Sequence, residues 1–191
     1  MAKTLYKMSS IIFIMFFFSL LLLGNSHTFS RNLSKESLDL KEEKLAHLHF
    51  YFHDVVTGPN ATAYRVAQAT ITNTSATGFG AVVVLDNALT EGPNLSSKLV
   101  GRAQGIYALA ALNESSLLMV LNFEFIEGVY NGSTLTILGR NPVFSPVREM
   151  PIVGGIGVFR FSRGYVQAKT FFFDMKTGYT VVEYNVYVLH Y

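Results

Sequence analysis

The chain has 191 residues, the length of one domain, and half of them are hydrophobic. The formal net charge is only +2 and no run of Lys or Arg occurs, so we expect no nucleic-acid partner. There is no Cys, which excludes thiol nucleophiles, thiolate metal sites and disulfides together. The 16 Phe and 10 Tyr suit β-strands and an aromatic-lined cavity, and stability must come from a packed core and a closed sheet.

Residues 1–26 have the organisation of a signal peptide. Two lysines precede a 13-residue apolar run, residues 11–23, which one serine interrupts, and Gly24 and Ser26 are small residues suited to a cleavage site. A transmembrane anchor is the alternative, but 13 residues of helix span about 20 Å, less than the ~30 Å hydrocarbon core of a bilayer. We therefore expect a secreted protein that has no membrane attachment once the leader is removed.

The segment after the leader is polar, and we interpret residues 27–46 as a flexible N-terminal arm before a domain that covers residues 47–191. N-x-S/T sequons occur along the chain, mostly in turn-like sequence between apolar runs where a glycan can be attached. The candidate acceptors are Asn32, Asn60, Asn73, Asn94, Asn113 and Asn131. These sequons and the leader both indicate the secretory route.

From His47 onward the chain has the two-residue period of β-strands. The strand candidates are a first run from residue 47, followed by 64–71, 79–85, 99–110, 117–126, 134–139, 164–173 and 180–191. Gly, Pro and Asn separate these runs as turn signals, and no helical period lasts long enough to cross a parallel sheet. Eight strands with short connections predict an all-β fold, either an antiparallel up-and-down β-barrel or a sandwich.

The longest stretch without a strand pattern, residues 141–163, is predicted to be an irregular loop. It contains three prolines and the glycine-rich turn 154–157. Loops of this length in compact domains are often functional. The glycine-rich turn is not a phosphate loop, because no Lys-Ser/Thr follows it and no βαβ unit contains it.

Several blocks of sequence, taken together and in order, resemble the plant dirigent family. They are residues 50–54 (FYFHD), 100–107 (VGRAQGIY), 130–135 (YNGSTL), 148–155 (REMPIVGG), 159–165 (FRFSRGY) and 182–187 (VEYNVY). The resemblance runs from about residue 48 to the C-terminus. It implies an eight-stranded antiparallel β-barrel that forms a homodimer or homotrimer and uses no cofactor or metal.

The resemblance also implies work on phenolic small molecules in the apoplast. Dirigent proteins direct the stereoselective coupling of monolignol phenoxy radicals in phenylpropanoid and lignan biosynthesis, and a separate oxidase, such as a laccase or peroxidase, produces those radicals. A related subgroup, the pterocarpan synthases, dehydrates isoflavanols through quinone methides. Residues 139–142 (GRNP) and 148–151 (REMP) are closer to this wider, non-lignan branch.

Asp54 is the first candidate for chemistry. Strict alternation places it on the apolar face of its strand, with Phe50 and Phe52. A carboxyl group that faces a barrel interior is desolvated, which raises its pKa and suits it to protonate a leaving group or hold a phenol. The alternative is a strand-end aspartate that accepts hydrogen bonds from the turn at residues 57–58. The resemblance favours the pocket role.

Tyr107 shares a strand face with Ala103 and Gly105, and such small neighbours leave the space that a cavity requires. Its hydroxyl can donate to a substrate oxygen, or it can instead lie at the rim of the barrel above a core ring. Both interpretations stay open from the residues alone.

Arg148 is the candidate for binding a phenolate or polarising a quinone methide carbonyl. The alternative is a surface ion pair with its neighbour Glu149. In lignan-forming relatives an Asp stands seven residues before this arginine, whereas this chain has Asn141. An amide forms hydrogen bonds but cannot transfer a proton as a carboxyl group does, so the acid role of that position is in doubt here.

Three histidines, His47, His49 and His53, follow one strand face with a spacing that can converge on a metal. Because this face is opposite the phenylalanine row, we expect exposed or interface histidines rather than ligands. No sequence signature of a Ser-His-Asp hydrolase is present.

Three functions are compatible with these observations. The leading hypothesis is a stereo-directing auxiliary protein that orients phenoxy radicals. The second is a true enzyme, an isoflavanol dehydratase of the pterocarpan synthase type. The third is a barrel that binds carbohydrate or lipid without chemistry. Convergence of Asp54, Tyr107 and Arg148 in one cavity favours the first two, and a purely apolar cavity favours the third.

Overall fold

The computed structural model describes residues 29–191, so the predicted leader, residues 1–26, lies outside the described residues. The chain divides into two units, one that ends at Leu40 and one that spans Lys41–Tyr191. The described part of the first unit contains one 3-10 turn, η1 (Glu36–Leu38). The hydroxyl of Ser34, which precedes this turn, accepts a hydrogen bond from the backbone N–H of Ser37. Among the described residues, none of the helices has the length and apolar character to cross a membrane.

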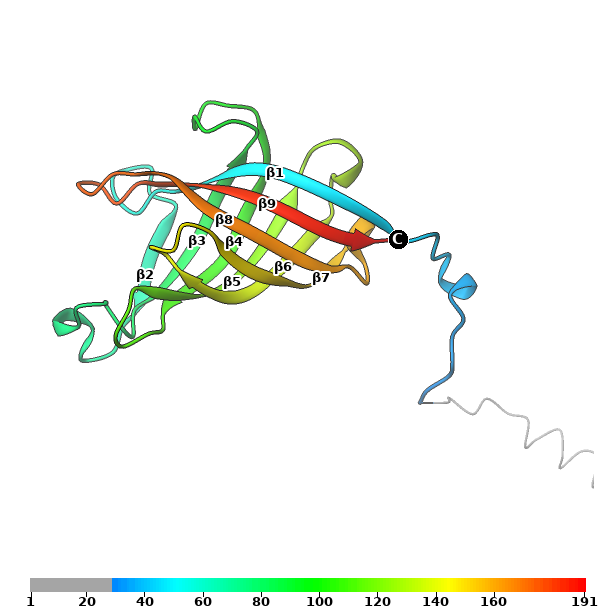
Figure 1. Ribbon diagram of the computed structural model, residues 1–191, viewed down its shortest axis with the longest axis horizontal. Coiled ribbons are helices and arrows are strands. Elements are labelled where there is room, and N and C mark those ends of the chain that lie inside the picture. The colour runs from blue at the N-terminus through cyan, green and yellow to red at the C-terminus, as the bar shows by residue number, and fades with distance from the viewer. Residues whose placement is uncertain (1–28) are drawn as a thin grey trace, which may run out of the picture. The chain divides into compact units, whose positions relative to one another are not determined.

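The second unit is a β-barrel built from antiparallel strands (Figure 1). Its strands among the described residues are β1 (Lys44–Asp54), β2 (Ala63–Ala67), β3 (Val82–Thr90), β4 (Leu99–Leu109), β5 (Ser116–Phe125), β6 (Thr134–Pro142), β7 (Arg148–Ile156), β8 (Arg163–Phe173) and β9 (Thr180–His190). Helical structure in this part is confined to the short 3-10 turns η2 (Thr72–Thr74), η3 (Gly128–Tyr130) and η4 (Gly157–Phe159).

The barrel closes where β1 pairs with β3. The strand order is β1-β9-β8-β7-β6-β5-β4-β3-β2, with the additional pairing β1–β3. Tyr51 of β1 lies opposite Thr90 of β3, and Ala63 of β2 lies opposite Leu85 of the same strand. Hence β1 and β2 run in one direction along one edge of β3. Together they occupy a single strand position in the barrel wall, interrupted by residues 55–62. The described wall therefore has eight strand positions, which confirms the predicted eight-stranded antiparallel barrel and excludes the sandwich.

Two strand predictions were wrong and offset each other in the count. Residues 64–71 do not form a separate strand position in the wall, because β2 ends at Ala67 and continues the position of β1 along β3. The predicted irregular loop 141–163 instead contains β7, whose alternate residues Arg148, Met150 and Ile152 are buried. A charged residue at the first inward position and Pro151 within the strand hid the two-residue period of β7.

The interior of the barrel is divided along its axis. One part is a close-packed core in which aromatic rings predominate, and Phe50 packs there edge-on against Phe123 and stacks on Tyr184. Such aromatic pairs stabilise a core beyond their buried area. The inward positions nearer Asp54 and Arg148 do not fill the other end, and they line a cavity instead.

Candidate functional site

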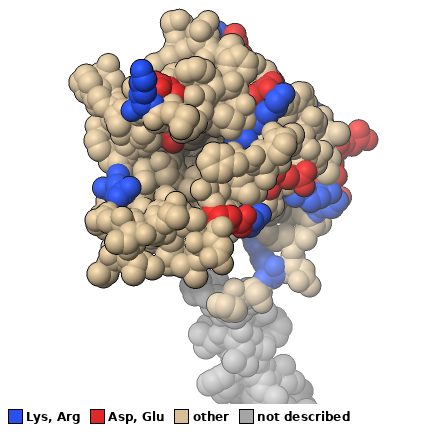
Figure 2. Space-filling model, turned by 60° about the vertical axis from the view of Figure 1, so that its left-hand side comes forward, with Lys and Arg blue, Asp and Glu red and all other residues tan. Residues whose placement is uncertain are grey.

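The cavity lies at the end of the barrel where β1 and β8 finish and β9 begins. This end of the barrel is at the left of Figure 1. Its volume is about 840 Å³, and most of its lining is apolar. Figure 2 brings this end of the barrel forward and shows a hollowed face with Lys and Arg side chains beside the hollow. Small-molecule sites commonly enclose roughly 300–1,000 Å³, mostly apolar with a few polar groups that orient the ligand. The cavity has this character.

Asp54 ends β1 and lines the cavity next to Phe52, as the alternation predicted. Its carboxylate accepts a hydrogen bond from Asn87 at 3.0 Å between Nδ2 and Oδ1. This hydrogen bond connects Asp54 to the neighbouring strand β3 and not to the turn at residues 57–58. Burial is the main influence on Asp54 and raises its pKa, against the opposing effect of hydrogen bonds from Asn87 and Tyr107.

Tyr107 lies on β4 and lines the same cavity. Its hydroxyl interacts with the Asp54 carboxyl group. Burial raises the pKa of Tyr107 strongly, and the adjacent charge of Asp54 raises it further. Tyr107 is therefore a neutral phenol at physiological pH and serves as a hydrogen-bonding group beside the acid.

Arg148 is the first residue of β7 and is almost fully buried, so it does not lie in a loop as predicted. Its Nε donates to Oδ1 of Asn141 at 3.1 Å, and a terminal nitrogen donates to the Thr170 hydroxyl at 3.0 Å. The alternative of an ion pair with Glu149 is wrong, and among the described residues no carboxylate pairs with this arginine. Burial lowers the pKa of Arg148, but a guanidinium remains charged at neutral pH.

The four residues predicted to carry chemistry thus line one cavity: Asp54, Tyr107, Asn141 and Arg148. Asp54 and Tyr107 interact directly, and Asn141 holds Arg148. The cavity therefore combines a desolvated acid, a neutral phenol and an uncompensated buried cation in apolar surroundings. This set can donate a proton to one oxygen and stabilise negative charge on another.

Two further residues of the cavity were missed. Tyr184 is fully buried on β9 where the core meets the cavity, and burial strongly raises the pKa of its phenol. The alternation along residues 180–190 was the signal, because it places Tyr184 in an inward row with Val182 and Val186. Arg65 of β2 also lines the cavity and lies close enough to Tyr107 to influence its pKa. No motif marked Arg65.

The three histidines are held by separate partners. His47 bonds Asn185 at 2.9 Å, and His49 bonds Glu183 at 2.8 Å. His53 is fully buried within this chain between the Tyr179 hydroxyl and the Thr90 hydroxyl, which corrects the expectation of an exposed or interface histidine. The outward face of β1 is covered here by the end of the β8–β9 hairpin, which strand alternation alone does not reveal.

The chain is similar to known proteins over nearly its whole barrel. A family described as dirigent-like protein matches residues 45–189. The chain is 53% identical over 165 residues to Dirigent protein 21 of Arabidopsis thaliana, covering 86% of this chain and 87% of that protein. It is 50% identical over 165 residues to Pterocarpan synthase 1 of Glycyrrhiza echinata, covering 86% and 88%. The solved structure of the pterocarpan synthase dirigent protein GePTS1 has 52% sequence identity and a TM-score of 0.75, covering 79% and 87%.

Proposed function

Because the chain belongs to the dirigent family, we propose that its cavity binds a phenolic substrate and dehydrates it stereoselectively through a quinone methide. The observation that carries this proposal is the position of the Asp54 carboxyl group in a mostly apolar cavity, where burial raises its pKa. Loss of water needs a proton donor for the departing hydroxyl group. Joining two radicals forms a carbon–carbon bond and needs no proton donor in that step.

The substrate that fits this chemistry is an isoflavanol with a phenolic hydroxyl conjugated to the carbon that bears the leaving hydroxyl. Asp54 gives its proton to that hydroxyl, the carbon–oxygen bond breaks, and water leaves. The conjugated phenol loses its proton, which in the net balance restores the acid form of Asp54, and a neutral quinone methide remains. A second phenol of the same molecule then adds to the methide carbon and loses its proton, while the carbonyl oxygen regains one. The net change is the loss of one water, and no oxidant is consumed.

The roles of the other residues follow from their positions. Arg148 is buried without a carboxylate partner, so its charge can stabilise an oxygen that becomes negative as the phenol ionises. Asn141 accepts from Nε and fixes the guanidinium without neutralising it. Tyr107 is a neutral hydrogen-bonding group beside Asp54 and orients the leaving oxygen.

Stereoselective coupling of phenoxy radicals is the second candidate, and the size of the cavity favours it. At about 840 Å³ the cavity is near the upper end of the usual range for small-molecule sites and has room for two small phenols. In that case a laccase or peroxidase outside the barrel supplies the radicals, and the cavity contributes orientation. A barrel that only binds a ligand is the third possibility.

Two incubations of the purified protein separate these functions, with chiral chromatography as the readout. One contains a racemic isoflavanol with no oxidant, and the other contains coniferyl alcohol with a laccase. We expect water loss to give one enantiomer in the first and a racemic mixture in the second. Optical activity only in the second overturns dehydration in favour of radical coupling, and no optical activity in either leaves only ligand binding.

A further inference from the structure

Asn87 is a buried amide outside the cavity, and the reaction described above assigns it no role. The inward row of β3 consists of Val83, Leu85, Asn87 and Leu89, so Asn87 is the polar member of an apolar series. It has no exposed surface and does not line the cavity. An amide in such a place destabilises the fold unless its hydrogen bonds are satisfied. Its bonds therefore indicate its role.

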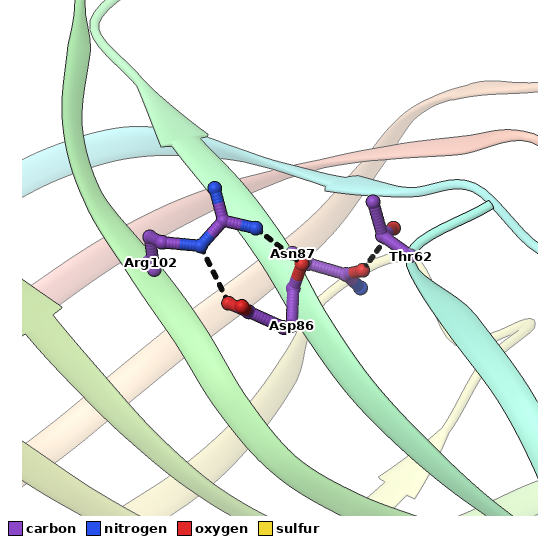
Figure 3. A network of polar contacts seen from close by, with 4 residues as sticks. All are labelled: Thr62, Asp86, Asn87 and Arg102. Atoms are coloured by element: carbon purple, nitrogen blue, oxygen red, sulfur yellow. Dashed lines mark hydrogen bonds and ion pairs between the residues drawn. The ribbon is translucent and has the colours of Figure 1, made fainter. Parts of the chain in front are cut away.

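Asn87 is the middle of a chain of hydrogen bonds in which every step donates toward Asp54. The backbone N–H of Val55 donates to the Thr62 hydroxyl at 3.4 Å, and this hydroxyl donates to Oδ1 of Asn87 at 2.5 Å. The amide nitrogen of Asn87 then donates to Oδ1 of Asp54 at 3.0 Å. Figure 3 shows the central contact, with Thr62 directed at the Asn87 amide.

Thr62 is held so that the direction of this chain is fixed. Its own backbone N–H donates to the Val55 carbonyl at 2.8 Å, and its carbonyl accepts from Asp86 N–H at 2.9 Å. On the opposite face of β3, Arg102 binds Asp86 through both its carboxylate and its backbone carbonyl (Figure 3). The end of the 55–62 loop is thereby secured to the barrel wall next to Asn87.

A flipped amide would be disfavoured at its Thr62 end. The Thr62 hydroxyl proton would face an N–H instead of a carbonyl oxygen, which loses a hydrogen bond in a buried place. At the other end, Oδ1 of Asn87 would face Oδ1 of Asp54, and a hydrogen bond would form there only with the acidic proton on that oxygen. Thr62 therefore determines that Asp54 faces the amide nitrogen of Asn87 and not its oxygen.

We propose that Asn87 is a positioning residue that keeps Oδ1 of Asp54 as an acceptor and so assigns the acidic proton of Asp54 to its other oxygen, Oδ2. This proposal rests on the acid role of Asp54 in the proposed function. Asn87 does not contact the substrate. It leaves Oδ2 as the oxygen that carries the proton for the leaving hydroxyl.

The amide also moderates the acidity of Asp54. Burial raises the pKa of Asp54, while the N–H of Asn87 stabilises the charged form and opposes that rise. The other ionisable groups around this carboxyl are Tyr107 on β4 and Tyr184 on β9, with Arg65 on β2 beyond Tyr107. Loss of the Asn87 donor should therefore move the pKa of Asp54 upward, away from its ordinary value.

Asn87→Leu tests the proposal, because leucine has a similar shape and cannot donate. We expect kcat for dehydration to fall about 10-fold, the effect of losing one positioned hydrogen bond, with KM within about twofold of wild type because no substrate contact is lost. The upper limb of the pH profile should move to higher pH. Thr62→Val should give the same shifts in weaker form, and Thr62→Ser, which keeps the hydroxyl, should behave as wild type.

A titration of the Asp54 carboxyl carbon by NMR in the unliganded protein provides a readout independent of turnover. The pKa of Asp54 should be higher in Asn87→Leu and in Thr62→Val than in wild type and Thr62→Ser. An unchanged pKa in both variants overturns the proposal, as does a rise in KM with kcat and pH profile unchanged. If Asn87→Leu does not fold, the two Thr62 variants decide. Failure of the proposed function is distinguished by an Asp54→Asn variant that retains full dehydration activity.

Discussion

At the residue scale, the chemistry of this barrel depends on a few polar groups in apolar surroundings. Asp54 is influenced by burial, which raises its pKa, and by two hydrogen bonds, which lower it, and burial is the larger effect. Arg148 is buried beside amide and hydroxyl acceptors, and in the described part of the chain no carboxylate pairs with it. The inward position of Asp54 was predictable from alternation in β1. The two partners of Arg148 were not predictable, because Asn141 and Thr170 lie on other strands.

The raised pKa of Asp54 leads to a prediction about stability. Well below the ordinary pKa of 3.8, Asp54 is protonated in the folded and the unfolded chain alike. As the pH rises above that value, the unfolded chain releases its proton first, so this group contributes less stability until the pH passes its folded pKa. Asp54→Asn removes this loss. Urea unfolding across a pH series should show the variant gaining stability relative to wild type as pH rises, and a difference independent of pH would contradict burial of the acid.

Asn141→Asp tests whether the uncompensated charge of Arg148 binds the substrate. A carboxylate at this position would accept from Nε in place of the amide and neutralise the guanidinium. We expect the dissociation constant of a phenolate ligand to rise about 10-fold, equivalent to about 1.4 kcal/mol, measured by calorimetry. Thr170→Val is the matched control, because it removes the other acceptor of Arg148 without adding charge. Equal effects of both variants would show that only geometry matters.

At the scale of elements, alternation predicted most of the wall and failed where a strand carries unusual residues. The row Leu117, Met119, Leu121 was plain from the sequence and lies inside the barrel. β7 was missed because its inward positions begin with Arg148 and its interior contains Pro151. The Arg148 side chain faces the cavity, so alternation failed at a position that holds a candidate functional residue. The closure through β1 and β2 depends on pairing between distant segments, which no local pattern contains.

Two glycines of the barrel wall share a backbone conformation but differ in how closely a neighbouring strand approaches. Gly105 has a φ of +154°, and a Cβ added there would lie 2.1 Å from the Val120 carbonyl oxygen of β5. Gly154 has the same φ, but a Cβ there would meet nothing within 4 Å. We expect Gly105→Ala to lower the free energy of unfolding by about 1–3 kcal/mol more than Gly154→Ala, because only the first forces the strands apart. Equal losses in denaturant titrations would mean that backbone conformation alone is responsible.

At the scale of the whole molecule, the family, the barrel and the cavity-facing candidates were all accessible from sequence. The volume of the cavity and the buried network behind Asp54 were not, since they arise from side chains that meet across strands. The secreted, apoplastic location and the homodimer or homotrimer remain predictions. For the oligomer, one candidate interface is the outward face of β1, where His49 and Tyr51 lie side by side, because aromatic side chains are enriched where subunits meet.

The secretory route has a direct test. All six sequon asparagines, Asn32, Asn60, Asn73, Asn94, Asn113 and Asn131, are exposed in the structure. We expect mass spectrometry of the native protein to find a mature N-terminus near His27 and glycans on some of these sites. Substitution of the third sequon residue by Ala, as in Ser133→Ala, should remove the corresponding glycan alone. An intact Met1 with no glycan would contradict secretion.

The central claim is that Asp54 is the proton donor of a stereoselective dehydration inside the barrel. The most direct measurement is the rate and enantiomeric excess of product from a racemic isoflavanol, by chiral chromatography, for wild type and Asp54→Asn. Asparagine matches the shape of aspartate but has no acid proton, so the rate should fall by about 10²-fold while circular dichroism stays unchanged. A variant that folds as wild type does and yields the same product at the same rate would contradict the claim.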